Sequence, residues 1–371
     1  MRIGVPKEIK VHEYRVGLTP MGVKELIDQG HQVVVQANAG SAIGYEDDAY
    51  REAGATIEPQ AEKVFRGSEM VVKVKEPQLG ECEWLSEGQV LFTYLHLAAD
   101  RPQTDALLNS GCTAIAYETV EDRQGGLPLL APMSEVAGRM AVQAGAHCLE
   151  REQGGRGVLL SGVPGVTPGR VTIIGGGVVG GQAARIAQGM GAQVTILDKS
   201  LPRLRQLDDM FGGRVKTLYS TGENIRQQLT QSDLVIGAVL LPGAKAPKLV
   251  SRDMLGLMPA GAVLVDVAID QGGCFETSRP TTHAEPIYEV DGIIHYCVAN
   301  MPGAVARTAT QSLTNATLPY VEALANKGWR SALAQVQGLA PGLNVHAGEL
   351  YCQGVAEAFD MPLASLDALL S

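Results

Sequence analysis

A glycine-rich segment has the residue types and spacing of a dinucleotide-binding site. It reads Gly175-Gly-Gly177-Val178-Val179-Gly180, after a hydrophobic stretch and before a helical one. Gly175 permits a tight turn, Gly177 lets the backbone approach a pyrophosphate, and Gly180 allows a helix to pack closely on a strand. The helix N-terminus offers free N–H groups to the phosphates. The alternative is a glycine-rich turn that binds nothing.

Asp198 supplies the acidic residue that such a site uses for the adenosine ribose. It lies about 20 residues beyond Gly175, at the end of the next predicted strand. A carboxylate there accepts hydrogen bonds from the ribose hydroxyls and repels a 2′-phosphate. We therefore predict NAD as the cofactor, rather than NADP.

Three ionisable side chains follow predicted strands in the N-terminal part of the chain. Arg15 lies in the loop after the first strand, Lys75 ends a later strand, and His96 comes directly after residues 90–95. Ligands of parallel sheets bind at this edge, and a guanidinium with an ammonium could hold a carboxylate. Lys73 has the same alternation as Lys75, so the strand pattern does not choose between them. Taken singly, Arg15 and Lys75 are more often exposed charges without a partner, and His96 is more often a structural histidine.

Asp270 is a fourth candidate, in the loop that follows a strand of the nucleotide-binding part. Its sequence, Val267-Ala-Ile-Asp270, lies at the edge of the sheet where a nicotinamide would bind. Asp266, inside the strand, is either a packing residue or a ribose-facing one. The alternative for Asp270 is a turn residue before two glycines.

The elements that must position these residues alternate between strands and helices. In the first part the pattern predicts strands at 2–5, 31–36, 70–75, 90–95 and 114–117, and helices from Thr19-Pro20 to Gly30 and near 46–53. A helix from about 134 to 151 then crosses between domains and leads into a glycine-rich linker. Strands separated by helices favour a mostly parallel α/β sheet.

The second part has the pattern of a doubly wound sheet. Six strands are predicted at 171–174, 194–197, 214–218, 234–239, 263–267 and 293–298, with helices at 178–190 and 201–211. A long helical stretch follows Pro302 and runs to about Lys327. The tail beyond it has no strand pattern, and we expect it to pack back on the first domain.

Composition narrows the class of protein. The 371 residues are 45% hydrophobic and 19% charged, which is typical of a folded protein of two or three domains. A net charge of −10 argues against nucleic-acid binding. We expect no membrane span, since no run of about 18 apolar residues occurs, and no secretion signal. The six cysteines form no CxxC pair, which excludes a compact thiolate zinc cluster and favours a cytoplasmic protein.

Several segments together resemble the alanine dehydrogenase and transhydrogenase family. They are Gly4-Val-Pro-Lys-Glu8, Glu13-Tyr-Arg-Val-Gly-Leu-Thr-Pro20, Pro164-Gly-Val, Ile174 to Gly180 with Asp198, Val267-Ala-Ile-Asp270, and Val298-Ala-Asn-Met-Pro-Gly303. The resemblance covers essentially the whole chain. It implies an α/β protein of two domains: a Rossmann-type doubly wound parallel sheet at 131–304, and a substrate domain built from both chain ends, 1–130 and the C-terminal helices of 305–371. It also implies a homohexamer.

The resemblance implies a role for each candidate. Arg15 and Lys75 would bind the substrate carboxylate, His96 would be a general acid/base, and Asp270 would be the second catalytic group. The positions implied to contact the cofactor are Ser134, Gly175, Gly177, Val178, Val179, Gly180, Asp198, Arg203, Ser220, Val239, Leu240, Val267, Ala268, Ile269, Asp270, Arg279, Val298, Ala299, Asn300 and Met301.

The implied activity is the NAD-dependent oxidative deamination of L-alanine to pyruvate and ammonia, and its reverse. Hydride leaves the α-carbon, and water adds to the resulting imine. The accompanying proton transfers suit a histidine, whose ordinary pKa lies near neutrality. Because His96 and Asp270 fall in different predicted domains, the two would meet only when the domains close.

The chain departs from the family pattern at two places. His12 stands where many members carry Asn, which affects only the local loop. Some members hold magnesium with a Glu and a His on a late helix, but here Glu322 is followed by Lys327. We therefore expect no metal.

Three other functions compete with this prediction. The NAD-binding component of a proton-translocating transhydrogenase shares the fold, but the presence of both His96 and Asp270 favours an amino-acid substrate. An inactive NAD-sensing module is disfavoured by the complete set Arg15, Lys75, His96 and Asp270. A related opine- or lysine-forming dehydrogenase is the third alternative.

Overall fold

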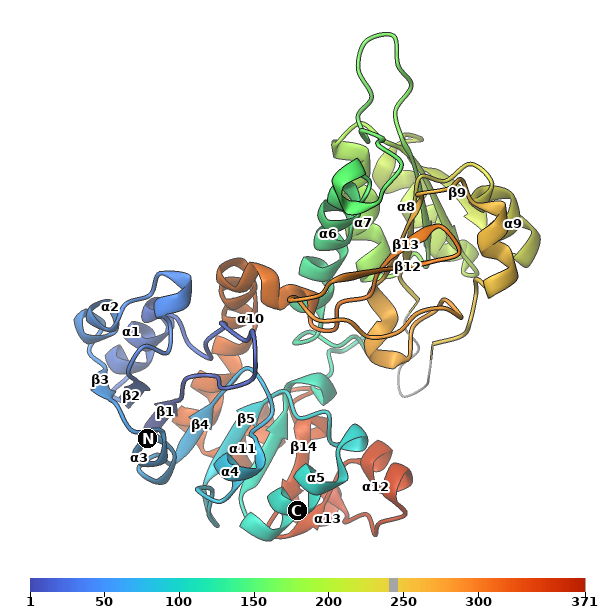
Figure 1. Cartoon of the computed structure of the whole chain (residues 1–371). Coiled ribbons are helices and arrows are strands. Elements are labelled where there is room, and N and C mark those ends of the chain that lie inside the picture. Colours follow the sequence, from blue (N-terminus) through green and yellow to red (C-terminus); the bar gives the residue numbers. More distant parts are fainter. Residues whose placement is uncertain (240–245, 371) are drawn as a thin grey trace. The chain divides into compact units, whose positions relative to one another are not determined.

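The computed structural model describes residues 1–239 and 246–370, and these form two compact units. The first unit comprises residues 1–133 and 305–371, and the second comprises residues 134–304. Each unit is a sheet covered by helices (Figure 1). The candidate Leu240 lies outside the described residues.

The first unit is built on an eight-stranded sheet in the order β15-β14-β6-β5-β4-β1-β2-β3. Its strands are β1 (Arg2–Val5), β2 (Gln32–Gln36), β3 (Thr56–Glu58), β4 (Met70–Val72), β5 (Val90–Thr93), β6 (Thr113–Ala116), β14 (Leu343–His346) and β15 (Glu349–Leu350). The strands β1 to β6 are parallel to one another. The carboxyl ends of β1, β4 and β5 therefore lie side by side, which places the loops after them at one edge.

The first unit also contains helices of 4 to 22 residues. They are α1 (Pro20–Asp28), α2 (Asp47–Glu52), α3 (Ala61–Arg66), α4 (Leu79–Cys82), α5 (Arg101–Ser110), α10 (Ala306–Lys327), α11 (Trp329–Gln335), α12 (Gln353–Phe359) and α13 (Leu366–Leu370). Thr19 caps α1 by accepting from the backbone N–H of Gly22 at 3.2 Å, and the left-handed Gly30 follows its end. The helix predicted from Thr19-Pro20 is confirmed.

The prediction that the tail has no strand is wrong. β14 and β15 form a hairpin beyond α10, and β14 pairs antiparallel with β6. Leu343 and Val345 are buried against the first unit's core. The β14 sequence Leu-Asn-Val-His mixes polar and apolar residues and gives no continuous apolar run, so the strand is not visible in the sequence, and its stability comes from this distant pairing. The short strands β3 and β12 were missed for the same reason.

The second unit has a seven-stranded sheet in the order β12-β13-β11-β10-β7-β8-β9. Its strands are β7 (Arg170–Ile174), β8 (Gln193–Asp198), β9 (Lys216–Tyr219), β10 (Leu234–Gly237), β11 (Val263–Asp266), β12 (Ile287–Val290) and β13 (Ile293–Tyr296). All neighbours are parallel except β12 with β13. The six predicted strands are confirmed, and they take the 3-2-1-4-5-6 order of a doubly wound sheet.

Both faces of this sheet are buried, as a doubly wound fold requires. Ile173 and Ile236 enter the hydrophobic cluster on one side, whereas their neighbours Ile174 and Val235 enter the cluster on the other. The helices are α6 (Ala131–Cys148), α7 (Val178–Gly189), α8 (Leu201–Phe211) and α9 (Gly222–Leu229). The strand order reverses between β7 and β10, and ligands of such sheets bind at that point.

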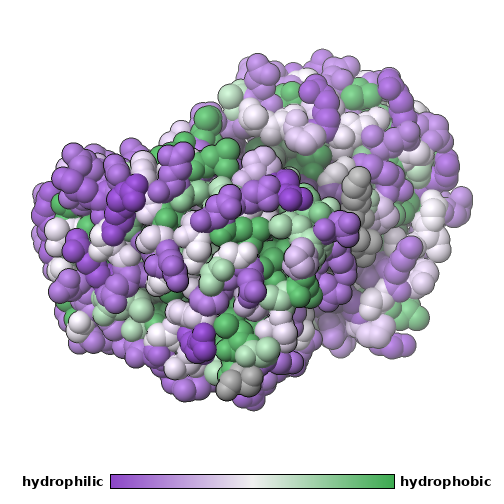
Figure 2. Space-filling model, turned by 90° about the horizontal axis from the view of Figure 1, so that it is seen from below, coloured by the Kyte–Doolittle hydropathy of each residue, from purple (hydrophilic) through white to green (hydrophobic). Residues whose placement is uncertain are grey.

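The surface mixes polar and apolar residues. On the face shown in Figure 2, hydrophobic side chains form groups among hydrophilic ones, as on most folded proteins. Among residues 1–239 and 246–370, no helix has the length and apolar character needed to cross a membrane.

Candidate functional site

The glycine-rich loop follows β7 and opens α7 at the point where the strand order reverses. Gly175 has φ +106°, and a Cβ there would lie 2.5 Å from the Ala238 carbonyl oxygen. A Cβ on Gly180 would lie 1.8 Å from the Gly175 oxygen, so helix and loop touch. A Cβ on Gly177, in contrast, would meet no described atom within 4 Å. The three glycines thus serve a turn, an open approach for a ligand, and close packing.

Asp198 and Arg203 brace this loop. The Asp198 carboxylate accepts from the Gly176 N–H at 2.6 Å and the Ser200 N–H at 2.7 Å. The Arg203 guanidinium donates from Nε to the Gly176 oxygen at 2.5 Å and from Nη2 to the Gly177 oxygen at 3.4 Å. Asp198 is therefore fixed beside the glycines, at the end of β8, where a ribose would bind.

Most of the other predicted cofactor contacts lie at the carboxyl ends of this sheet's strands. Val239 follows β10, Ser220 follows β9, 267–270 follow β11, and 298–301 follow β13. Arg279 lies with its guanidinium 4.1 Å from the centre of the Tyr288 ring. Ser134 lies instead near the start of α6.

Arg15 in the first unit is held by Glu13. Its Nε and Nη2 donate to the two carboxylate oxygens at 2.7 and 2.6 Å, and both side chains are buried. Burial opposes the guanidinium charge, but the bonds with Glu13 raise the pKa of Arg15 above its usual value. Nη1 contacts the Met133 sulfur at 3.1 Å. The guanidinium is thus held in one orientation by Glu13, which accepts from its Nε and Nη2.

The structure separates the two lysines that the strand pattern left equivalent. The buried Lys73 ammonium lies 3.1 Å from both Glu8 and Glu81, and these carboxylates raise its pKa although burial opposes its charge. Lys75 is only half-buried, and burial together with the nearby Arg15 lowers its pKa. Lys73 is thus held by structural partners, while Lys75 lies beside Arg15.

The predicted strand 70–75 ends earlier, at Val72, for a physical reason. The Glu8 carboxylate accepts the N–H groups of Val74 at 2.7 Å and Lys75 at 3.2 Å, because β1 has already ended at Val5. A side chain replaces the neighbouring strand, and it fixes the backbone that carries Lys75.

His96 is held in the same way after β5. Glu118 accepts the N–H of Leu95 at 3.1 Å and that of His96 at 2.5 Å, and its Oε1 lies 3.8 Å from Nδ1 of the imidazole. His96 has the left-handed φ of 52°. Its ring stacks on Tyr94 with centroids 5.7 Å apart. The imidazole remains half exposed and is therefore accessible to a substrate.

Tyr94 does not compete with His96 for proton transfer. Its hydroxyl donates to the Leu129 carbonyl at 2.5 Å, and burial raises the pKa of Tyr94 well above its usual range. Arg15 lies in the loop after β1, Lys75 follows β4 and His96 follows β5, and these three parallel strands are adjacent in the sheet. The structure thus brings Arg15, Lys75 and His96 to one edge of the first unit's sheet.

Asp270 lies in the second unit, exposed on the 3₁₀ helix Val267–Gln271 after β11. Of the two alternatives for Asp266, a packing residue or a ribose-facing one, the structure supports the packing residue. It is fully buried, and its carboxylate accepts from the N–H groups of Ala268, Cys274 and Phe275 at 3.1, 2.9 and 3.2 Å. Burial raises the pKa of Asp266 despite these donors.

Sequence reasoning missed the carboxylates that hold the candidates. Glu8, Glu118 and Asp266 each accept two or more backbone N–H groups from the segment that carries Lys75, His96 or Asp270. Glu13 holds Arg15. Glu8 and Glu13 lie in motifs that the sequence singles out, and Asp266 was considered as a packing residue, but Glu118 was not noticed. Among the residues that the structure describes, no three His, Cys, Asp or Glu side chains form a group that could hold a metal ion.

These features define the class: a two-unit α/β protein with a doubly wound dinucleotide-type sheet and a separate cationic site. The family model "Alanine dehydrogenase/PNT, N-terminal domain" matches residues 4–137, and "Alanine dehydrogenase/PNT, C-terminal domain" matches residues 141–353. The chain belongs to this alanine dehydrogenase/PNT family.

Individual relatives span the whole chain. It is 63% identical over 370 residues to an alanine dehydrogenase of Halomonas elongata and 54% identical over 371 residues to one of Mycolicibacterium smegmatis, with 100% of each chain covered. A solved L-alanine dehydrogenase matches with a TM-score of 0.94 and 54% identity, over 97% of this chain and 99% of that one. A transhydrogenase of Sinorhizobium meliloti, at 24% identity, shares the fold with a TM-score of 0.81, over 95% and 99% of the two chains.

Proposed function

We propose that this protein is an NAD-dependent dehydrogenase that interconverts L-alanine with pyruvate and ammonia. The observation that carries the proposal is the buried Arg15–Glu13 pair beside the half-buried Lys75, at the same sheet edge as an accessible His96. Arg15 and Lys75 together suit a small carboxylate. Relatives of the same length are named alanine dehydrogenase.

The residues of the first unit then have distinct tasks. Arg15 and Lys75 hold the substrate carboxylate and so fix the α-carbon. His96 exchanges a proton with the substrate's nitrogen or oxygen. Asp270 is the second proton-transfer group, supplied by the second unit.

Several features of the second unit support NAD binding. A Cβ on Gly177 would meet no described atom within 4 Å, so a pyrophosphate could approach the backbone there and bind the first N–H groups of α7, at Val178 and Val179. Asp198, Arg203, Ser220, Val239, Arg279 and 298–301 would line the cofactor. When bound, NAD supplies the hydride acceptor.

Assignments beyond this chemistry also belong to the proposal. Residues 1–130 and 305–371 form the substrate domain and 131–304 the NAD domain. The assembly is a homohexamer, and the location is the cytoplasm. All six cysteines are unpaired, as is usual in a reducing compartment.

The direct test is to mix the purified protein with NAD and L-alanine and to follow NADH absorbance. We expect NADH to form with alanine and to be consumed with pyruvate and ammonia. No signal with alanine, together with hydride transfer to a nicotinamide nucleotide analogue, would instead support transhydrogenase activity, the second candidate that the shared fold favours.

Carboxylate binding should weaken at alkaline pH. Lys75 holds its charge only below its pKa, and burial with Arg15 lowers that pKa from the usual 10.5. Rising pH therefore removes the charge earlier than for an exposed lysine. We expect the Kd of oxamate, an inert pyruvate analogue, to rise in this range when measured on the protein–NADH complex. Lys75→Arg should bind oxamate without this alkaline loss. An identical loss in that variant would contradict the assignment.

The protein should prefer NAD to NADP. Asp198 is fixed beside the ribose position, and the Arg203 guanidinium, which could otherwise pair with a 2′-phosphate, is engaged by the loop carbonyls. Asp198→Ala should reduce the ratio of kcat/KM for NAD over NADP by about 10- to 100-fold, as for a hydrogen bond to a charged group. Comparable kcat/KM values for both cofactors in the unmodified protein would disprove this role.

A further inference from the structure

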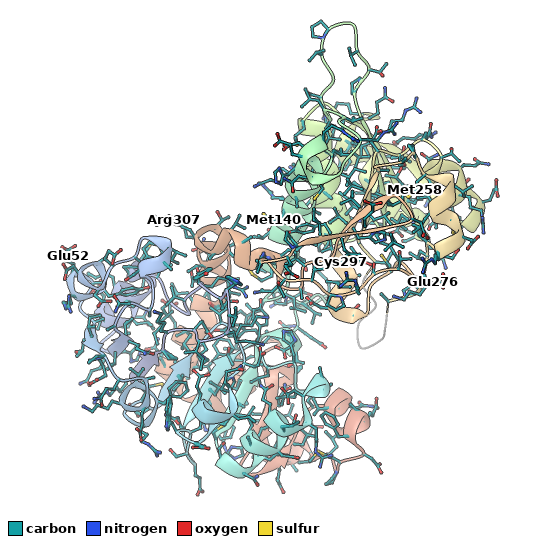
Figure 3. All side chains as sticks on the ribbon, viewed as in Figure 1. Glu52, Met140, Met258, Glu276, Cys297 and Arg307 are labelled. Carbon is teal, nitrogen blue, oxygen red and sulfur yellow. The ribbon has the colours of Figure 1, made fainter. Side chains whose placement is uncertain are left out.

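The loop that carries Asp270 is anchored on its inner side by a carboxylate. Asp266, fully buried, accepts N–H groups from Ala268, Cys274 and Phe275 and the Ser278 hydroxyl at 2.5 Å. The Sγ of Cys297, which follows β13, lies 3.8 Å from the Ser278 Oγ. Cys297 is labelled in Figure 3. One buried anion thus gathers the donors on both sides of Asp270.

An ammonium anchors the same loop from the other side. The Lys248 Nζ donates to the carbonyl oxygens of Gly272 at 2.5 Å, Gly273 at 2.8 Å and Phe275 at 3.1 Å. Gly272 and Gly273 have φ of 87° and 73°, a left-handed turn that aims their carbonyls toward one point. Three carbonyl oxygens directed at one point repel each other unless a cation lies between them. The three N–H donors of a lysine ammonium can bind one oxygen each.

The segment around Lys248 also runs along the loop. Ala246 N–H donates to the Gln271 oxygen at 3.1 Å and Leu249 N–H to the Cys274 oxygen at 2.7 Å, and Glu276 N–H donates to the Val250 oxygen at 2.9 Å. Glu276 is labelled in Figure 3. Lys248 is therefore fixed relative to the turn that begins two residues after Asp270.

We propose that Lys248 is a positioning residue that holds the Asp270 carboxylate in its reactive place by binding the carbonyls of the adjoining turn. The proposal rests on the proposed function, in which Asp270 transfers a proton. Asp270 itself is exposed on a short 3₁₀ helix. Its position therefore depends on how firmly the turn after it is held. Asp266 binds the backbone N–H groups of this turn, and Lys248 binds its carbonyl oxygens.

The first experiment compares Lys248→Met with Lys248→Arg and with the exposed Lys216→Met on β9. A displaced catalytic group costs up to about 100-fold in rate. We expect kcat for alanine deamination to fall about 10- to 100-fold in Lys248→Met and to recover partly in Lys248→Arg. KM for alanine should stay within about twofold, since the carboxylate site is not touched, and NADH should still bind, since the glycine loop is not touched. Lys216→Met should match the unmodified protein.

The second experiment asks whether Lys248 acts through Asp270. In an Asp270→Asn background, Lys248→Met should cause no further loss of the residual kcat, because the group that it positions is already gone. An equal loss in both backgrounds, an unchanged kcat in Lys248→Met alone, or a loss of NADH binding would each overturn the proposal. Full activity of Asp270→Asn alone would instead overturn the proposed role of Asp270, so the two failures are distinguishable.

Discussion

Replacing His96 with asparagine is expected to lower kcat for both deamination and amination by about 10²- to 10⁴-fold, the usual contribution of a proton-transfer group. Asparagine is chosen because His96 has a left-handed backbone, which asparagine tolerates better than alanine does. The Glu118 carboxylate accepts the backbone N–H groups of Leu95 and His96, and these bonds do not need the imidazole, so the loop should keep its form. Steady-state kinetics and NADH binding provide the measurement.

The control for this variant is His147→Ala, on the exposed surface of α6. It should leave kcat unchanged, and neither variant should alter NADH affinity. His96→Ala should also be nearly inactive, as should Asp270→Asn, which retains the shape of the side chain without its charge. Near-normal turnover of both His96 variants in both directions would show that His96 is not the acid/base, and the mechanism would then depend on Asp270 alone.

The nucleotide-binding half was predictable because each of its signals is local. Hydrophobic strands of four to six residues, buried on both faces, are visible as continuous apolar runs. The loop from Gly175 to Gly180 needs particular residues within a span of six, and Asp198 follows on the next strand. Helix α8 was predicted with the bounds Leu201–Phe211 that the structure has, since Ser200 caps it and Gly212 ends it.

The remainder depends on contacts between distant segments. β14 is a strand only because it lies beside β6, more than 200 residues earlier in the chain. In the same way, Glu8 ends β4 and Glu118 ends β5, so both strands stop short of the predicted positions. A lone glutamate in a sequence gives no sign that it will bind backbone N–H groups far away. The candidates were therefore visible from the sequence, whereas the groups that hold them were not.

Lys75→Ala should abolish most of the activity while leaving the fold intact. Lys73→Met should destabilise the fold while leaving activity in the molecules that remain folded. Losing one charged partner of a desolvated ligand costs about 2–5 kcal/mol, or about 30- to 5,000-fold in kcat/KM for alanine. Lys75 is half-buried and is replaced without leaving buried carboxylates unpaired. Lys73, in contrast, neutralises Glu8 and Glu81 in the interior, and its loss should destabilise the protein by about 3–5 kcal/mol.

The two lysine variants are best compared by three measurements: thermal unfolding, the Kd of NADH, and kcat/KM for alanine. Lys75→Ala should unfold at the normal temperature and bind NADH normally, because the glycine loop lies in the other unit. Lys73→Met should unfold at a lower temperature, with residual activity while it remains folded. If a folded Lys73→Met is inactive and Lys75→Ala is normal, Lys73 is the lysine that binds the substrate carboxylate. The buried contacts of Lys73 argue against that outcome. Its ammonium lies 3.1 Å from the carboxylates of Glu8 and Glu81, which neutralise it and weaken its attraction for a third carboxylate.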